Sequence, residues 1–257
     1  MRRALFAAEI VSVEPEQLVQ VLGEIVRRGR SAGPPFEAAL LALATLLSTD
    51  AVPYDRLEVL YAEARRTGEI ELQELLLSPQ PARCAELEPM GLLQRRGRVL
   101  TVGERMQAAR NTTRTEIDRL LRDTDPRVIR NLLQNARIVE RDVTLLATRR
   151  PTTPAIQLEV FLSGRWIARP AVRRALARNP FTPTDLTLRL LSLLPEQDLA
   201  EIAQALDLPD AVRQSAARRL RGSRIGIAEL DAATRTEADP DLQDPRPASA
   251  DDPPRGA

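Results

Sequence analysis

RPAVRRALARNPFTPTDLTLRLLSLL, residues 169–194, closely resembles an earlier part of the same chain. That earlier part, residues 125–150, reads DPRVIRNLLQNARIVERDVTLLATRR. Each stretch holds a proline, a valine with an arginine close behind it, an apolar run and an asparagine, and then an aspartate followed by leucines. Similarity at a fixed spacing indicates a repeated structural unit.

The repeat has the periodicity of helices. Its valines lie 44 and 40 residues apart, and each is followed one helical turn later by leucine or alanine on the same face. These pairs are Val128 with Leu132, Val172 with Leu176, and Val212 with Ala216. Asn135 and Asn179 lie at the expected helix ends, where asparagine tolerates the left-handed conformation. Two short helices in each period of 40 to 44 residues predict an α-solenoid, whose units bury their apolar faces on one another.

Further start signals for helices accompany the repeat. Three pairs have the spacing of a capping box, in which a hydroxyl binds a backbone N–H and a carboxylate three residues later reaches back. The pairs are Thr101 with Glu104, Thr113 with Glu116, and Thr182 with Asp185. The third pair would also place Pro183 at the first helical position.

The first hundred residues predict about four helices after an opening helical stretch. The start, MRRALFAAEIVSVEPE, has the short apolar run of a signal peptide, but Glu9 interrupts it and no clear cleavage site follows. The predicted helices cover residues 15–29, 34–48, 53–68 and 69–78. Gly68 fits the position just after a helix end, and the proline-bearing stretch 79–91 is the expected boundary between subdomains.

The repeated half resembles known helical-repeat families. DPRVIRNLL and DLPDAVRQSAARRL look like HEAT-type helices, and AVRRALARNPFTPTDLTLRLL is similar to the bacterial leucine-rich-repeat variant. The likeness covers about residues 101–220 and extends to bacterial repeat proteins with the same VGER, VIRNLL and NPFTP order. Two departures are Arg169, where the pattern has aspartate, and the stretch 151–168, which fits no clean unit. The resemblance implies a short, irregular HEAT-like solenoid and no particular activity.

The resemblance implies a structural role for some arginines of the repeated half and leaves others without one. In HEAT-type solenoids the repeated arginine pairs with an aspartate of a neighbouring turn or repeat, which implies a ladder of Arg130, Arg173 and Arg213 with Asp125 and Asp207. Other arginines crowd the same helices, where like charges one turn apart repel by a few tenths of a kcal/mol. We therefore predict a patch for an anionic partner, made of Arg174, Arg178, Arg218 and Arg219.

Composition and charge support an all-α chain in three parts. Aromatic residues make up only 3% against 43% apolar residues, which favours helices packed through aliphatic stripes. Residues 1–100 carry a net charge of −2, the predicted repeats 101–230 carry +7, and the tail 231–257 carries −4. The tail is rich in proline and aspartate and has one large apolar residue, so we expect it to be disordered.

Several chemical functions are disfavoured by the residues present. All 37 basic residues are arginine, and the absence of histidine removes the commonest general base and metal ligand. The sequence contains no glycine-rich phosphate loop, GxSxG or CxxC motif, so we predict no enzyme, cofactor or metal site. The single Cys84 cannot form an internal disulfide, and no stretch approaches 18 apolar residues, so we expect a cytoplasmic protein without a membrane span.

The function that the sequence favours is non-enzymatic: a scaffold or adaptor that presents a helical surface to another protein. The alternative is a nucleic-acid-binding repeat protein that uses its arginine-rich face to contact phosphates. Single-strand binding generally needs aromatic stacking, and Trp166 is the only tryptophan. We expect Trp166 to fill space in the core or between repeats and not to stack on a base.

Overall fold

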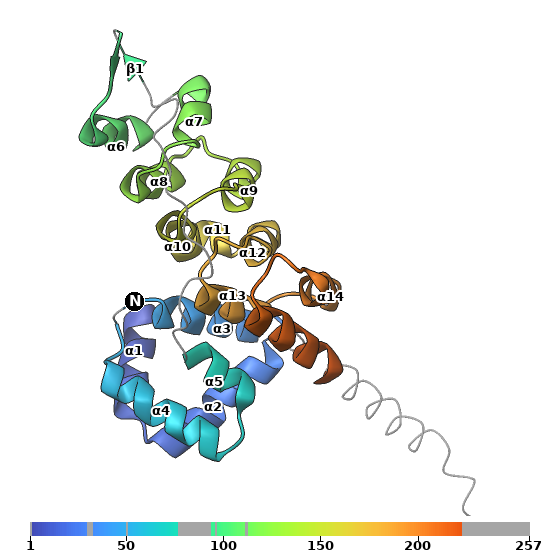
Figure 1. Ribbon diagram of the computed structural model, residues 1–257. Helices are drawn as coiled ribbons and strands as arrows, with labels where there is room; N and C mark the ends of the chain where they lie inside the picture. The colour runs from blue at the N-terminus through green and yellow to red at the C-terminus, as the bar shows by residue number, and fades with distance from the viewer. Residues whose placement is uncertain are drawn as a thin grey trace, which may run out of the picture. The chain divides into compact units, whose positions relative to one another are not determined.

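The computed structural model describes residues 2–29, 33–49, 51–76, 94–95, 97–110 and 113–222. The described part is mostly helical, which confirms the all-α prediction (Figure 1). Three features predicted from sequence lie outside the described residues: Cys84, the boundary stretch 79–91 and the tail 231–257. Within the described residues, no helix has both the length and the apolar character needed to cross a membrane.

Five helices make up the N-terminal bundle: α1 (Arg2–Ser12), α2 (Pro15–Arg28), α3 (Pro34–Leu47), α4 (Tyr54–Arg66) and α5 (Ile70–Leu76). Their bounds agree closely with the predicted ranges. Proline begins α2 and α3, where its missing N–H costs nothing. The chain leaves α4 through Gly68, whose φ of 74° is in the left-handed region, and Glu69 N–H donates to the Ala64 carbonyl at 2.9 Å. Aliphatic side chains of all five helices form the core.

A small hairpin follows the bundle in sequence. Strands β1 (Gln94–Arg95) and β2 (Arg98–Val99) pair antiparallel, with Gln94 opposite Val99. Gly97 has a φ of 76°, which the tight turn requires. The sequence analysis did not predict this hairpin, because two-residue strands are too short for apolar and polar residues to alternate visibly.

The array of helices from residue 102 onward contains α6 (Val102–Arg110), α7 (Arg114–Leu120), α8 (Pro126–Leu133), α9 (Glu140–Thr148), α10 (Pro154–Leu162), α11 (Gly164–Ile167), α12 (Pro170–Ala177), α13 (Thr184–Leu191) and α14 (Glu196–Gln204). A further helical segment covers residues 210–222. The helices are stacked in two rows (Figure 1). In one row α6 packs on α8 and α8 packs on α10, and in the other α9 packs on α12.

The expectation of two helices per period is wrong for the period between Pro126 and Pro170. That period holds four helices, because α10 and α11 occupy the stretch 151–168 that fitted no repeat unit. Local signals explain α10: Pro154 stands in its first turn, and the Ile156 N–H donates to the Thr153 side chain at 3.4 Å. A threonine followed by proline is a good helix start even where the repeat pattern fails.

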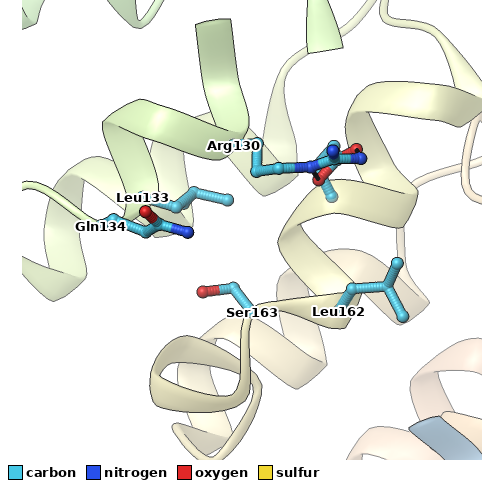
Figure 2. A pocket seen from close by; sticks show the side chains of 6 residues that line it. Arg130, Leu133, Gln134, Leu162 and Ser163 are labelled. Carbon is cyan, nitrogen blue, oxygen red and sulfur yellow. Dashed lines mark hydrogen bonds and ion pairs between the residues drawn. The ribbon is translucent and has the colours of Figure 1, made fainter. Parts of the chain in front are cut away.

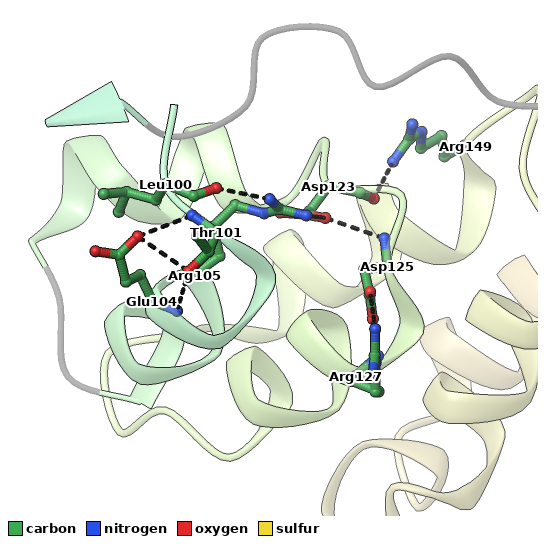
Figure 3. Close-up of polar contacts among 8 residues, drawn as sticks. All are labelled: Leu100, Thr101, Glu104, Arg105, Asp123, Asp125, Arg127 and Arg149. Carbon is green, nitrogen blue, oxygen red and sulfur yellow. Dashed lines mark hydrogen bonds and ion pairs between the residues drawn. The ribbon is translucent and has the colours of Figure 1, made fainter. Parts of the chain in front are cut away.

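One of the three predicted capping boxes forms. The Glu104 N–H donates to Thr101 Oγ1 at 3.3 Å, and the Thr101 N–H donates to Glu104 Oε2 at 2.9 Å (Figure 3). Thr113 precedes α7 but makes no capping hydrogen bond through its side chain. Thr182 instead donates to the Leu176 carbonyl at 2.7 Å. Pro183 is therefore the N-cap residue of α13 and not its first helical residue.

A buried ion pair fixes the loop between α7 and α8. Arg105, in α6, donates from Nε to Asp123 at 2.7 Å and from Nη1 to the Leu100 carbonyl at 2.9 Å (Figure 3). The Asp123 carboxylate also accepts the Asp125 N–H at 3.0 Å. Arg149, at the end of α9, donates to the Asp123 carbonyl at 3.0 Å. Three segments of the array therefore meet at Asp123.

The N-terminal bundle packs against the array at α13, and both belong to one compact unit, residues 1–217. Arg189, in α13, is buried and donates from Nη1 to Ser48 Oγ and to Asp185, each at 2.8 Å. Its Nε donates to the Leu75 carbonyl at 3.3 Å. Burial lowers the pKa of Arg189, and the Asp185 carboxylate opposes that shift. A second unit begins at Arg218.

Candidate interaction surface

The arginine ladder implied by the HEAT resemblance is not formed as predicted. Each of the five side chains pairs elsewhere: the pairs are Arg130–Glu159, Arg173–Glu37, Arg213–Asp210, Asp125–Arg127 and Asp207–Arg150. The alignment of the repeat explains the error. Arg173 is equivalent to Ile129, and both side chains are buried. Arg130 is equivalent to Arg174, and both are exposed.

A different ion pair does recur along the array. Arg130, in α8, donates to Glu159, in α10, from Nε at 2.8 Å and from Nη2 at 2.5 Å. Arg174, in α12, pairs from Nε with Asp198, in α14, at 2.7 Å. The carboxylates raise the pKa of Arg130 and of Arg174. Arg130 and Arg174 therefore each pair with a carboxylate of the second helix further along the chain.

Two of the four predicted partner-binding arginines lie together on α12. The Arg174 side chain is 49% exposed, whereas its partner Asp198 is only 4% exposed. Arg178, the residue that caps α12, pairs from Nη1 with Glu201 at 2.5 Å, and both side chains are about half exposed. Each arginine is therefore matched with a carboxylate of α14, which reduces the positive charge of this surface.

The other two predicted arginines belong to the second compact unit. Arg218 is half-buried, and Arg219 is only 1% exposed. The Arg219 side chain is thus not on the surface where an anionic partner would contact it. A partner-binding role for Arg174, Arg178 and Arg218 stays a prediction.

Asn135 and Asn179 join neighbouring helices of the array. Asn135 follows α8 and donates from Nδ2 to the Ala109 carbonyl of α6 at 2.8 Å. Asn179 follows α12 and donates from Nδ2 to the Ala147 carbonyl of α9 at 2.7 Å. In both residues Oδ1 accepts the backbone N–H two residues later, at 2.8 and 3.1 Å. The asparagines therefore supply side-chain donors to carbonyls in the last turns of α6 and α9.

Trp166 also binds a helix-end carbonyl. Its side chain is buried, and Nε1 donates to the Leu133 carbonyl of α8 at 2.8 Å. The Arg165 guanidinium lies over its ring, 4.3 Å from the ring centroid. The burial of Trp166 agrees with the expectation that its side chain fills space in the interior.

A pocket of about 240 Å³ lies where the C-terminal ends of α8 and α10 meet (Figure 2). Leu133 and Gln134 line it from α8 and the turn that follows, and Leu162 and Ser163 line it from the end of α10. The Arg130–Glu159 ion pair stands at one edge. The lining thus combines leucine methyl groups with an amide, a hydroxyl and a guanidinium. Such a site can accept an apolar side chain and hydrogen-bond the groups beside it.

Most residues of this pocket escaped the sequence analysis. Glu159 belongs to no motif of the sequence. Gln134 and Ser163 belong to no motif, and only the packing of α8 on α10 brings them together. Arg130 is the one lining residue that the repeat pattern identified, as a predicted member of the ladder.

A scan against protein-family models found no match, and searches of curated proteins and of solved structures also found none.

Proposed function

We propose that the chain is a non-enzymatic, HEAT-like helical scaffold that presents its array to another protein. The pocket between α8 and α10 is the surface that we assign to this contact. The same proposal places the protein in the cytoplasm, because its single cysteine cannot form a disulfide within the chain.

The lining of the pocket is the observation that carries the proposal. The exposed Arg130 stands beside Leu133 and Leu162 at the mouth of a concave site. Arginine is enriched at the energetic centres of protein interfaces, where an apolar pocket receives an anchor side chain of the partner. The volume of about 240 Å³ suits one such side chain and is below the usual range of sites for cofactors.

The ion pairs along the array favour a protein partner over nucleic acid. A surface that tracks phosphates gains affinity when its arginines release counterions from the phosphate backbone. Arg130, Arg174 and Arg178 each pair with a carboxylate of the chain itself. A phosphate could bind these arginines only by displacing their carboxylate partners. A protein surface with both polar and apolar side chains can pack over the intact ion pairs.

Site-specific photo-crosslinking tests the proposal. A photoreactive phenylalanine analogue replaces Gln134 in the full-length protein, expressed in cells that make it naturally. We expect a discrete adduct with another protein. The matched control carries the analogue at Gln197, an exposed glutamine of α14 outside the pocket, and should not give that adduct.

A second change separates specific binding from chance proximity. Leu162→Asp, made together with the probe at Gln134, places a carboxylate in the apolar wall and should abolish the adduct. An adduct with nucleic acid, or equal protein adducts at Gln134 and Gln197, would contradict the proposal.

A further inference from the structure

A second cavity, of about 280 Å³, lies between the N-terminal bundle and the array. Gly29 and Glu37 line it from the end of α2 and the first turn of α3, and Arg173 lines it from α12. Its remaining wall is apolar and consists of Pro170, Leu193, Leu194 and Pro195. The cavity therefore combines one buried cation with an aliphatic wall, apart from the pocket between α8 and α10.

Arg173 is an unusual residue for such a wall. It is only 5% exposed, and its Nε is buried without a hydrogen-bond acceptor. Its Nη2 pairs with Glu37 Oε1 at 2.6 Å, but the Glu37 side chain is 42% exposed. A buried guanidinium is stable only when it is paired. Among the described residues, Glu37 is the carboxylate that pairs with Arg173, and its side chain is largely open to solvent.

The backbone around the cavity adds to its positive character. Three helices begin there: Glu37 is in the first turn of α3, Pro170 begins α12, and Pro195 is the N-cap residue of α14. Helix N-termini carry partial positive charge and stabilise anions nearby. Together with Arg173, they favour a second negative group in the cavity.

We propose that this cavity binds a small organic carboxylate with an aliphatic part. The ligand carboxylate takes the place of Glu37 on the Arg173 guanidinium, and the aliphatic part packs on Leu193 and Leu194. Glu37 then competes with the ligand for the Arg173 guanidinium. The existing Arg173–Glu37 pair shows that a carboxylate fits beside this guanidinium. A bidentate carboxylate would satisfy more of the guanidinium donors than the single contact with Glu37. This inference is independent of the scaffold function.

Three probes at matched ionic strength test the chemistry with the full-length protein. Hexanoate carries both the carboxylate and the aliphatic part, hexan-1-ol carries only the aliphatic part, and inorganic phosphate is an oxyanion without one. Thermal unfolding and calorimetric titration measure binding. We expect hexanoate alone to raise the Tm and to give a saturable heat. Equal effects of hexanoate and hexan-1-ol, or of hexanoate and phosphate, would overturn the proposal.

Variants test whether the cavity is the site. Arg173→Gln should weaken hexanoate binding by about tenfold or more, which is the loss of one charge-assisted contact. Glu37→Gln removes the competitor and should bind hexanoate more tightly than the wild type. The ligand should also raise the Tm of Glu37→Gln by more than that of the wild type, because it restores a partner for Arg173.

A matched control is Glu24→Gln, which removes a glutamate that pairs with Arg27 and Arg28 on the surface of α2. It should bind hexanoate as the wild type does. The result of Glu37→Gln remains informative if Arg173→Gln fails to fold. Binding by Glu37→Gln that is no tighter than that of the wild type would show that Glu37 is only a structural partner, and would overturn the proposal.

Discussion

Gln157, in α10, is fully buried, and within the described part of the chain neither its amide oxygen nor its amide nitrogen has a hydrogen-bond partner. A buried polar group without a partner costs about 1–3 kcal/mol, so an apolar residue of similar size should be more stable there. We predict that Gln157→Leu raises the free energy of unfolding by about 1 kcal/mol, measured by urea denaturation. The control Gln134→Leu changes an exposed glutamine and should have little effect. A destabilised Gln157→Leu would show that the amide is satisfied.

Asp142 should link stability to pH. Its buried carboxylate accepts hydrogen bonds from Arg114 at 2.5 Å and from the Val139 N–H at 3.0 Å. Arg114 is the main cause that lowers the pKa of Asp142 below its ordinary value. Because the folded pKa lies below the unfolded one, this stabilisation is present above about pH 4 and is lost as the pH falls further.

The Arg114→Gln variant tests the predicted direction of the pH dependence. The pKa of Asp142, followed by carboxyl NMR, should rise in the variant, and the loss of stability toward low pH should become shallower. Arg119→Gln, which changes another exposed arginine of α7, is the control. An unchanged Asp142 titration in Arg114→Gln would show that the pair does not form in solution.

Individual side chains were predictable where a local pattern determines their surroundings. Thr101 with Glu104 forms the predicted capping box, and Trp166 is buried as expected. The partners of Arg173 and Arg174 were not predictable, because adjacent positions on a helix point about 100° apart. A shift of one position in the repeat alignment exchanges a buried arginine for an exposed one.

At the scale of helices, Asn135 and Asn179 make the same kind of contact, because each follows a helix and binds a carbonyl near the end of another. Asn135 binds a carbonyl of α6, and Asn179 binds a carbonyl of α9. We predict that Asn135→Ala and Asn179→Ala each lower the free energy of unfolding by about 2 kcal/mol, because a buried carbonyl loses its partner. Chemical denaturation of both variants measures the effect. Gln134→Ala, next to Asn135 but exposed, should change stability by less than about 0.5 kcal/mol.

The two α12 arginines should differ in their contribution to stability. Arg174→Gln leaves the buried Asp198 carboxylate without its cation and should cost about 1–2 kcal/mol. Arg178→Gln breaks a pair between exposed side chains and should cost less than about 0.5 kcal/mol. Denaturation at low and at high salt compares them. Equal, small losses for both variants would mean that Arg174 is as free to bind a partner as the sequence suggested.

Helix positions followed largely from proline, glycine and threonine signals at their ends, as in α2, α3 and α4. The number of helices per repeat was harder to predict, because α10 and α11 have their own start signals but share no pattern with the neighbouring repeats. The pocket between α8 and α10 exists because these two helices are neighbours in a row. The spacing of residues in the sequence does not show directly which helices become neighbours, so the pocket could not be predicted.

At the scale of the whole molecule, the N-terminal bundle packs on α13 and not on α6, the first helix of the array. Arg189 is central to this packing, since it binds groups of α3, α5 and α13. We predict that Arg189→Gln lowers the free energy of unfolding by about 3 kcal/mol, because three acceptors lose a buried cation. Denaturation followed by circular dichroism measures the loss. Arg65→Gln, at an exposed position of α4, should be neutral.

How the first hundred residues contact the array could not be predicted from the sequence. The answer depends on long-range contacts between α5 and α13, more than a hundred residues apart, such as the one from Arg189 to the Leu75 carbonyl. No local pattern encodes such a contact. The basic net charge of residues 101–230 also does not give the local charge of the array surface, because arginines and carboxylates distant in sequence pair in the fold.

Hydrogen exchange of the full-length protein, alone and with the partner identified by crosslinking at Gln134, tests the proposed binding surface most directly. We predict that the partner slows exchange at residues 130–134 and 159–163, on the two sides of the pocket between α8 and α10. Protection confined to the α12 arginines Arg174 and Arg178, or no protection at the pocket, would contradict a scaffold that binds through α8 and α10.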